Sequence, residues 1–295
     1  MEDKLLMTVR YCGRYFSPVE LDLIRDLIKA HPTREAIARA MCAELNWTKP
    51  DGLPKVMSAK VVLLRMHRHG LVVLPPPKSK GNNVRRPPVF TPATDPKTPI
   101  TGTRKDIIDL HLRKIQNRAD SRSWNEFIAR YHYLGYVPLP GAQIRYFIEG
   151  NQQILGAIGM GAAAWKVAPR DLFAGWNHEQ RQDRLHLIVN NARLLILPWV
   201  RVRYLASSTL SLLSRQLPID WQDMYGYRPA LLETFVDRER FKGTCYLAAN
   251  WIHVGHTQGR GKLDRYTRRQ EPVKEIFLLP LTANFRHVLI NGITE

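Results

Sequence analysis

The 295-residue chain has few cysteines and no long apolar run. Its three cysteines, Cys12, Cys42 and Cys245, are far apart and form no C-x-x-C pair, which excludes a disulfide framework. The longest apolar stretch, Leu194 to Val200, contains Pro198 and falls short of the roughly 18 residues that cross a bilayer. We therefore expect no membrane association. Because the N-terminus carries no charged-then-apolar leader, we also expect a cytoplasmic location.

Several familiar catalytic motifs are missing as well. The chain contains no H-E-x-x-H helix, no Walker-type phosphate loop and no zinc-ligand spacing. Positive charge, in contrast, is abundant: 44 Lys and Arg against 26 Asp and Glu give a net charge of +18. A field of this sign attracts phosphate backbones and speeds association with them. The charge favours DNA as a partner, although a basic composition that serves only solubility is the alternative.

Residues 1–76 are predicted to fold as a winged-helix DNA-binding domain. Ser17, Pro18 and Glu20 have the spacing of a capping box at the start of a helix over residues 17–30. Thr33 is expected to cap a second helix and Ser58 a third. Three short helices before a short strand follow the order of a winged helix-turn-helix.

The strand in this prediction is Leu71 to Leu74, directly after the third helix. In such modules the last helix lies in the major groove, while flanking cations contact phosphates. We therefore predict DNA contacts from the third helix, through Ser58, Lys60, Arg65 and Arg68. A three-helix unit that serves protein contacts or dimerisation is the alternative.

Residues 77–105 read as a basic, proline-rich linker. The segment is poor in apolar residues, so it is not expected to bury enough surface to fold by itself. Its cations, among them Arg85 and Arg86, could follow a nucleic-acid backbone. A linker that is merely solvated is the alternative.

Residues 106–295 are predicted to form an α+β domain with one mixed sheet and helices on both sides. A hairpin is expected over residues 143–149 and 154–160, and further strands over 231–237 and 274–279. The order resembles the acyltransferase fold of the Gcn5-related superfamily, whose helix after the fourth strand presents amides to a coenzyme A pyrophosphate. The corresponding turn here, residues 205–208, lacks the glycine-rich pattern of that superfamily. The resemblance therefore implies a fold more than a function.

Several long runs resemble the family named after DruA, a protein of the Druantia anti-phage system. They are LGYVPLPGAQIRYFI, NNARLLILPWVRVRYLASSTLSLL, DWQDMYGYRPALLETFVD, GTCYLAANWIHVGHTQGRG and VKEIFLLPL. The resemblance covers roughly residues 110–281 and implies a role in bacterial defence or mobile DNA, with partner proteins from such systems. One departure is Tyr204, where the family more usually carries asparagine.

Acidic and basic residues gather near the C-terminal end of the predicted strand 231–237. Glu233 and Asp237 are four residues apart and share a face, and Asp220 precedes them by one loop. Converging carboxylates could hold Mg²⁺ for phosphodiester cleavage, with Glu233 and Asp237 as metal ligands. Three cations of the following loop would clamp the strand, namely Arg260, Lys262 and Arg265. Pairing of Glu233 with an arginine and helix capping by Asp237 are the alternatives.

A cysteine and two tyrosines are further candidates for a reactive centre. Cys245, beside His253 and His256, could be a nucleophile, but its apolar neighbours favour a packed side chain. Tyr225 or Tyr246 could attach covalently to DNA. Together the sequence favours a DNA-processing protein, a nuclease or a strand transferase acting in defence or transposition. A non-catalytic DNA-binding subunit and an acyltransferase-like enzyme are the alternatives.

Overall fold

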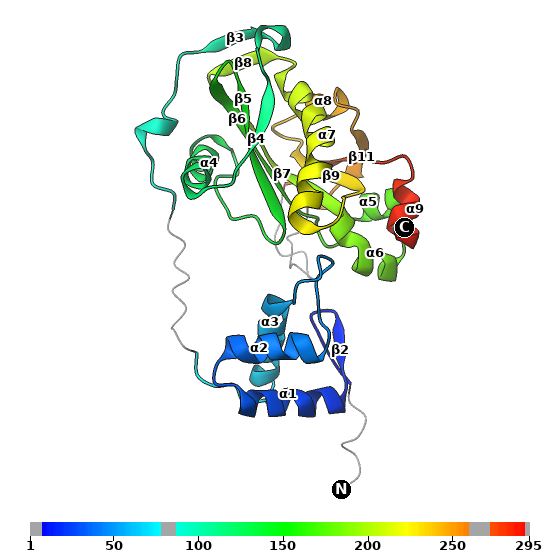
Figure 1. Ribbon diagram of the computed structural model, residues 1–295. Coiled ribbons are helices and arrows are strands. Elements are labelled where there is room, and N and C mark those ends of the chain that lie inside the picture. Colours follow the sequence, from blue (N-terminus) through cyan, green and yellow to red (C-terminus); the bar gives the residue numbers. More distant parts are fainter. Residues whose placement is uncertain (1–7, 78–86, 260–271, 293–295) are drawn as a thin grey trace. The chain divides into compact units, whose positions relative to one another are not determined.

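The computed structural model (Figure 1) describes residues 8–77, 87–259 and 272–292. The chain divides into two compact units, Met1–Arg85 and Arg86–Glu295. Each unit has its own apolar core.

Unit 1 is a hairpin followed by three helices. The strands β1 (Val9–Tyr11) and β2 (Arg14–Phe16) pair antiparallel, and α1 (Pro18–Ala30), α2 (Arg34–Glu44) and α3 (Val56–Arg68) follow. The predicted capping box is confirmed, because the Ser17 hydroxyl accepts from the Glu20 amide and the Glu20 carboxylate accepts from the Ser17 amide. The Thr33 cap of α2 is confirmed as well.

The predicted order of a winged helix is wrong. The hairpin precedes the helices, and Leu71 to Leu74 form no strand in the described part of unit 1. Val72 and Leu74 are buried in the core, so their apolar pattern reflects packing of an irregular segment. The third cap was also misplaced: α3 begins at Val56, which puts Ser58 inside the helix.

Unit 2 is built on a seven-stranded mixed sheet. In spatial order its strands are β4 (His111–Lys114), β5 (Gln143–Gly150), β6 (Gln153–Ala162), β7 (Ile188–Ile196), β9 (Leu231–Asp237), β11 (Lys274–Pro280) and β10 (Ile252–His256). Counted along the chain from β4, this order is 1-2-3-4-5-7-6. Among the pairings of described residues in this sheet, β7 with β9 is the only parallel one. The helix α7 (Leu205–Tyr225) lies between these two strands in sequence. This arrangement confirms the predicted acyltransferase-like topology.

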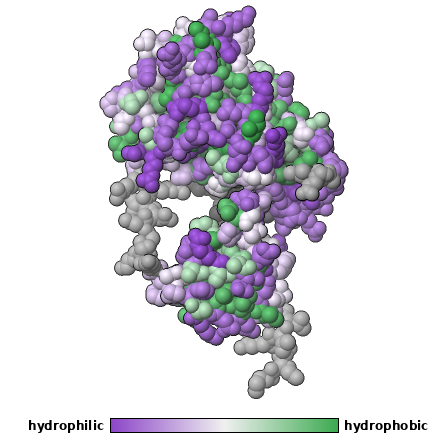
Figure 2. Space-filling view, in the orientation of Figure 1, coloured by the Kyte–Doolittle hydropathy of each residue, from purple (hydrophilic) through white to green (hydrophobic). Residues whose placement is uncertain are grey.

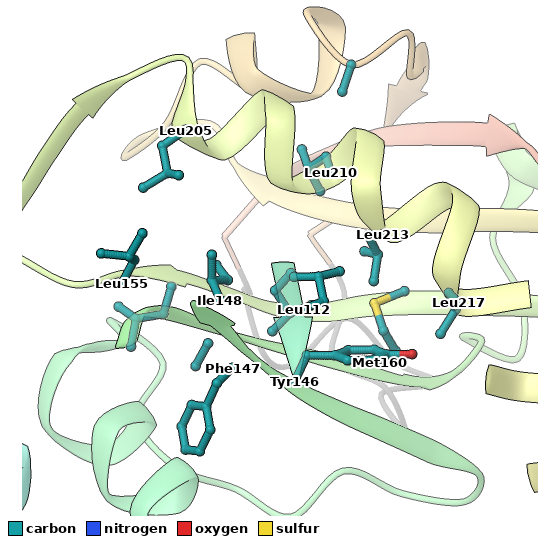
Figure 3. Close-up of a cluster of buried hydrophobic side chains, with 14 of the residues drawn as sticks. Leu112, Tyr146, Phe147, Ile148, Leu155, Met160, Leu205, Leu210, Leu213 and Leu217 are labelled. Carbon is teal, nitrogen blue, oxygen red and sulfur yellow. The ribbon is translucent and has the colours of Figure 1, made fainter. Parts of the chain in front are cut away.

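Helices cover both faces of the sheet, as predicted. Figure 3 shows Leu210, Leu213 and Leu217 of α7 above the sheet, facing Leu112 and Tyr146. Phe147 points to the opposite face and packs edge-on against Phe127, at a ring-centroid distance of 6.1 Å. Phe127 belongs to α4 (Arg118–Tyr131), so α4 and α7 lie on opposite faces. The remaining helices are α5 (Ala168–Ala174), α6 (His178–Arg184), α8 (Thr244–Leu247) and α9 (Phe285–Asn291).

Much of the predicted linker belongs to unit 2. Residues 100–103 form β3 (Ile100–Thr103), which pairs parallel with β8 (Val200–Arg203). The short 3₁₀ helices η1 (Pro92–Thr94) and η2 (Arg104–Asp106) flank β3. Thr91 and Thr94 both donate hydrogen bonds to the buried carboxylate of Glu126 in α4. The linker prediction is therefore wrong for residues 87–105, because Glu126 and β8 supply partners that the composition of the segment does not reveal.

Candidate active site

The strands β7 and β9 separate part-way along the sheet. They pair from Ile188 with Leu231 to Asn191 with Thr234, although β7 continues to Ile196 and β9 to Asp237. Beyond that point a cavity of about 450 Å³ opens between them. Leu194 and Val236 line it from the two strands.

A bulge in β7 accompanies the separation. In the pairing with β6, Gly159 is opposite Arg193 while Met160 is opposite Asn191, so Ala192 is an extra residue. A bulge bends its strand and increases the local twist. Hence β7 turns away from β9 at the position where their pairing ends.

A buried polar network lies in the wall of the cavity. The Tyr246 hydroxyl, from α8, donates to Asn191 Oδ1 at 2.7 Å. Thr234 Oγ1 donates to the Asn191 carbonyl at 3.0 Å. Burial raises the pKa of Tyr246 above its ordinary value, so the phenol keeps its proton at neutral pH. The cavity therefore contains a fixed, neutral proton donor.

The segment after α4 supplies another wall. Burial, together with the positive charge of Arg193, lowers the pKa of His132 to about 4. The imidazole is therefore neutral at pH 7. Its Nδ1 accepts from the Leu134 amide at 3.2 Å, which assigns the remaining proton to Nε2. His132 is thus a hydrogen-bond donor at Nε2.

A second hollow, of about 330 Å³, lies along the first turns of α7. The helix starts after Tyr204, which has φ +65° and offers no side-chain cap to the first amides. The hollow is lined by Ser207, Ser208, Arg104 and Arg215, and no carboxylate of the described residues lines it. Hydroxyls, guanidinium groups and a helix N-terminus together suit a phosphate.

Comparison with known proteins identifies the family. The profile described as Druantia protein DruA matches residues 66–269. The chain belongs to the DruA family. No curated protein matches this DruA-family chain.

Several solved structures resemble its fold. A chimera of the spermidine N-acetyltransferase SpeG from Vibrio cholerae with hSSAT is 12% identical, with a TM-score of 0.37 over 58% of this chain and 95% of the other. The dodecameric SpeG from Vibrio cholerae in an intermediate state is also 12% identical, with a TM-score of 0.34 over 63% and 98%. An N-acetyltransferase from Staphylococcus aureus Mu50 is 16% identical, with a TM-score of 0.30 over 48% and 68%. We infer no activity from similarities of this size.

The three predicted catalytic acids do not converge in the DruA-family chain. Glu233 is fully buried, accepts from the Ala164 amide at 2.7 Å and forms an ion pair with Arg170 at 2.9 Å. Burial raises its pKa, against the opposing effect of Arg170. Its role is to hold β9 to α5 from within the core.

Asp220 and Asp237 lie apart from this ion pair. Asp220 is on α7, where it bonds Lys114 at 2.8 Å and the Tyr146 hydroxyl at 2.9 Å. Asp237 accepts from the Glu239 amide at 3.1 Å and so stabilises the turn after β9. Within the described ranges no group of three or more His, Cys, Asp or Glu could hold a metal ion. The predicted convergence is therefore wrong, because a separate partner engages each acid.

The predicted nucleic-acid contacts are distributed as follows. Lys60 forms an ion pair with Glu35 of α2. Arg65 and Arg68 are exposed on α3, whereas Ser58 is half-buried. The others lie outside the described residues, namely Arg85, Arg86, Arg260, Lys262 and Arg265.

The sequence reasoning missed Asn191, Thr234, His132 and Arg193. Cys245 and Tyr246 were considered for other chemistry, and both line the cavity. One available signal was the polar pair Asn190 and Asn191 inside the apolar run IVNNARLLI. Amide side chains in a buried strand need hydrogen-bond partners, so such a pair indicates a polar network.

Proposed function

We propose that this chain transfers an acyl group from a coenzyme A-type thioester to an acceptor molecule, and that it does so in anti-phage defence. The observation that carries the chemistry is the separation of β7 from β9 beyond Asn191 and Thr234, with the cavity between them. Membership of the DruA family supports the defence role. No helix in the described ranges is both long and apolar enough to cross a membrane.

The residues present fit such a donor. Phosphates would bind in the hollow at α7, where Ser207 and Ser208 offer hydroxyls and Arg104 and Arg215 offer positive charge. Beyond Asn191 the side of β7 that faces β9 has no strand opposite it among the described pairings, which leaves space beside this strand for the arm of the donor. The hydroxyls of Ser207 and Ser208 would bond the phosphates in place of the glycine-rich turn that this chain lacks. When bound, the thioester would supply an activated acyl group.

The chain's own residues supply proton control and orientation. Tyr246 holds a proton at its hydroxyl, and its bond to Asn191 Oδ1 fixes the direction of that hydroxyl. His132 presents a neutral Nε2–H near the opposite wall. Leu194 and Val236 add apolar side chains to the lining of the same cavity, which would favour exclusion of water when a donor is bound.

Ligand-dependent stability tests the binding of the donor. We expect acetyl-coenzyme A to raise the melting temperature of the full chain. Ser208→Glu should abolish this rise, because it places a negative charge in the phosphate hollow. Arg122→Gln, an exposed change on α4, is the matched control and should leave the rise intact. The absence of a rise in the unmodified chain, or an equal rise in Ser208→Glu, would contradict the proposal.

DNA binding by unit 1 is a second candidate. Arg65 and Arg68 are exposed on α3 and, among ion pairs of described residues, neither has a carboxylate partner. We limit this proposal to DNA binding. Glu233 forms an ion pair with Arg170, so it gives no support to Mg²⁺-dependent cleavage. Gel shifts in a salt series should show affinity falling steeply, and replacing both arginines by glutamine should reduce the logarithmic slope by about 2. A flat salt response would contradict it.

A further inference from the structure

Two aromatic side chains are exposed together at the α4 side of the cavity. Tyr133 and Phe241 meet edge-on with ring centroids 5.3 Å apart, and they are 36% and 50% exposed. His132 stacks on Tyr133 with ring centroids 4.9 Å apart. All three line the cavity. Large apolar surface left in water beside a cavity marks a ligand contact.

The positive charge of Arg193 acts on both His132 and Tyr133, although Arg193 is not itself among the residues that line the cavity. It follows the bulge in β7, and its Nη1 donates to the carbonyl of its neighbour Ala192 at 2.7 Å. Its Nε is buried and has no hydrogen-bond partner. None of the ion pairs formed between described residues includes Arg193. A partly buried cation of this kind is costly unless an anion arrives with a ligand.

The loop after β9 adds further positive charge at the same opening. Arg240 lies over the Tyr133 ring at 5.3 Å, and Lys242 lines the cavity with its side chain exposed. Asp237, at the end of β9, accepts from the Glu239 amide and forms an ion pair with Arg240 at 3.6 Å, which leaves Lys242 and Arg193 as the cations near the opening that form no ion pair among the described residues. The opening therefore combines aromatic faces with an excess of cations.

We infer that this opening binds a nucleotide unit, its base stacked on Phe241 beside the edge-on Tyr133 ring and its phosphate paired with Arg193. Aromatic faces bind nucleobases, and guanidinium groups bind phosphate in two parallel hydrogen bonds. A polyamine would be repelled by Arg193, Arg240 and Lys242, and an aliphatic carboxylate would leave the rings unused. Under the proposed function this nucleotide unit would be the acyl acceptor, and that assignment rests on the proposed function. The binding of the nucleotide does not depend on it. The unit is either a free nucleotide or the end of a nucleic-acid strand.

Isothermal titration without any thioester tests the inference on the full chain. The probes are dAMP, deoxyadenosine, inorganic phosphate and a 5′-phosphorylated single-stranded octamer. We expect dAMP to bind at least about tenfold more tightly than deoxyadenosine or phosphate alone, since both parts of the ligand are recognised. A tighter octamer would identify a strand end as the source, and equal affinity would identify the free nucleotide.

Variants locate the binding. Arg193→Gln should weaken dAMP binding about tenfold or more, and Phe241→Leu should weaken it severalfold by removing the stacking face. Because Arg193 forms no ion pair with another described residue, Arg193→Gln should keep the melting temperature of the unmodified chain, which separates lost binding from lost folding. Arg122→Gln is the control and should bind normally.

Two results would overturn the inference: no binding of dAMP or the octamer, or binding that Arg193→Gln leaves unchanged. Failure of the proposed function gives a different pattern. In that case acetyl-coenzyme A would leave the melting temperature unchanged while dAMP still bound through Arg193.

Discussion

Tyr204 adopts a left-handed backbone conformation at the residue before α7, with φ +65° and ψ 3°. This region disfavours most side chains but tolerates asparagine. An asparagine at this position would therefore suit the backbone better than the tyrosine does. The tyrosine ring is largely exposed and contacts the Arg203 guanidinium at 5.4 Å, so little core packing offsets the strain.

We predict that Tyr204→Asn stabilises unit 2 by about 1 kcal/mol, because it relieves strain without opening a cavity. Urea denaturation followed by circular dichroism measures the change. Tyr204→Val is the opposing control and should destabilise, since a β-branched side chain fits this conformation poorly. A loss of stability in Tyr204→Asn would show that the contact with Arg203 outweighs the strain.

His132 should make stability depend on pH. Its pKa is lowered from 6.5 to about 4 in the folded chain, so between these values the unfolded chain binds a proton that the folded chain does not. The contribution of His132 to the free energy of unfolding is complete above pH 6.5 and decreases as the pH falls towards 4. In His132→Asn the amide oxygen can still accept from the Leu134 amide, but the titrating group is gone. Denaturation midpoints at several pH values should fall less steeply for this variant than for the unmodified chain, and identical slopes would contradict the assignment.

The partners of single residues explain which site predictions failed. The sequence placed Glu233 and Asp237 on one face of a strand, and this was correct. The alternative that Glu233 pairs with an arginine is confirmed, but the sequence did not identify Arg170, 63 residues earlier, as that partner. Acid spacing along one strand predicts geometry, whereas the choice between an ion pair and a metal depends on residues brought close only by the fold.

At the scale of elements, α8 depends on Gly243. This residue begins the helix at φ +69°, and a Cβ placed there would lie 2.5 Å from the Phe277 ring. Phe277 in turn stacks on Tyr246 at 5.7 Å. The position of the Tyr246 hydroxyl in the cavity thus follows from a close approach that only glycine permits.

We predict that Gly243→Ala costs about 2–3 kcal/mol, the sum of backbone strain and displacement of the Phe277 ring. The matched control is Gly226→Ala at the end of α7, where φ is +79° but nothing lies within 4 Å of the added carbon. That variant should cost only about 1 kcal/mol. Equal costs in urea denaturation would mean that the ring moves freely and does not position Tyr246.

The spacing of apolar residues and the positions of turn residues predicted most helices and strands of unit 2. They predicted neither the bulge in β7 nor its separation from β9. The hairpin and the strands predicted over 231–237 and 274–279 are confirmed, the last of them extending to Pro280. The bulge at Ala192 and the separation of β7 from β9 were not predictable, because register between strands depends on neighbours distant in sequence.

At the scale of the whole molecule, charge and architecture bear on the two proposals. Hydrophilic residues cover most of the visible face of unit 2 in Figure 2, in keeping with the net charge of +18. Composition predicted a polyanionic partner from this charge, but it could not locate the contacts. The aromatic and cationic opening near Arg193 belongs to unit 2, and the exposed arginines of α3 belong to unit 1.

The reactivity of Cys245 tests the central claim most directly, because this thiol lines the cavity between β7 and β9 while Cys12 is exposed in unit 1. Alkylation rates of both cysteines would be measured by mass spectrometry with and without desulfo-coenzyme A, which has no thiol of its own. A donor arm in the cavity should slow the alkylation of Cys245 at least about fivefold at a saturating concentration and leave Cys12 unchanged. An unchanged rate at Cys245 under those conditions would contradict the proposal that the cavity holds a coenzyme A-type donor.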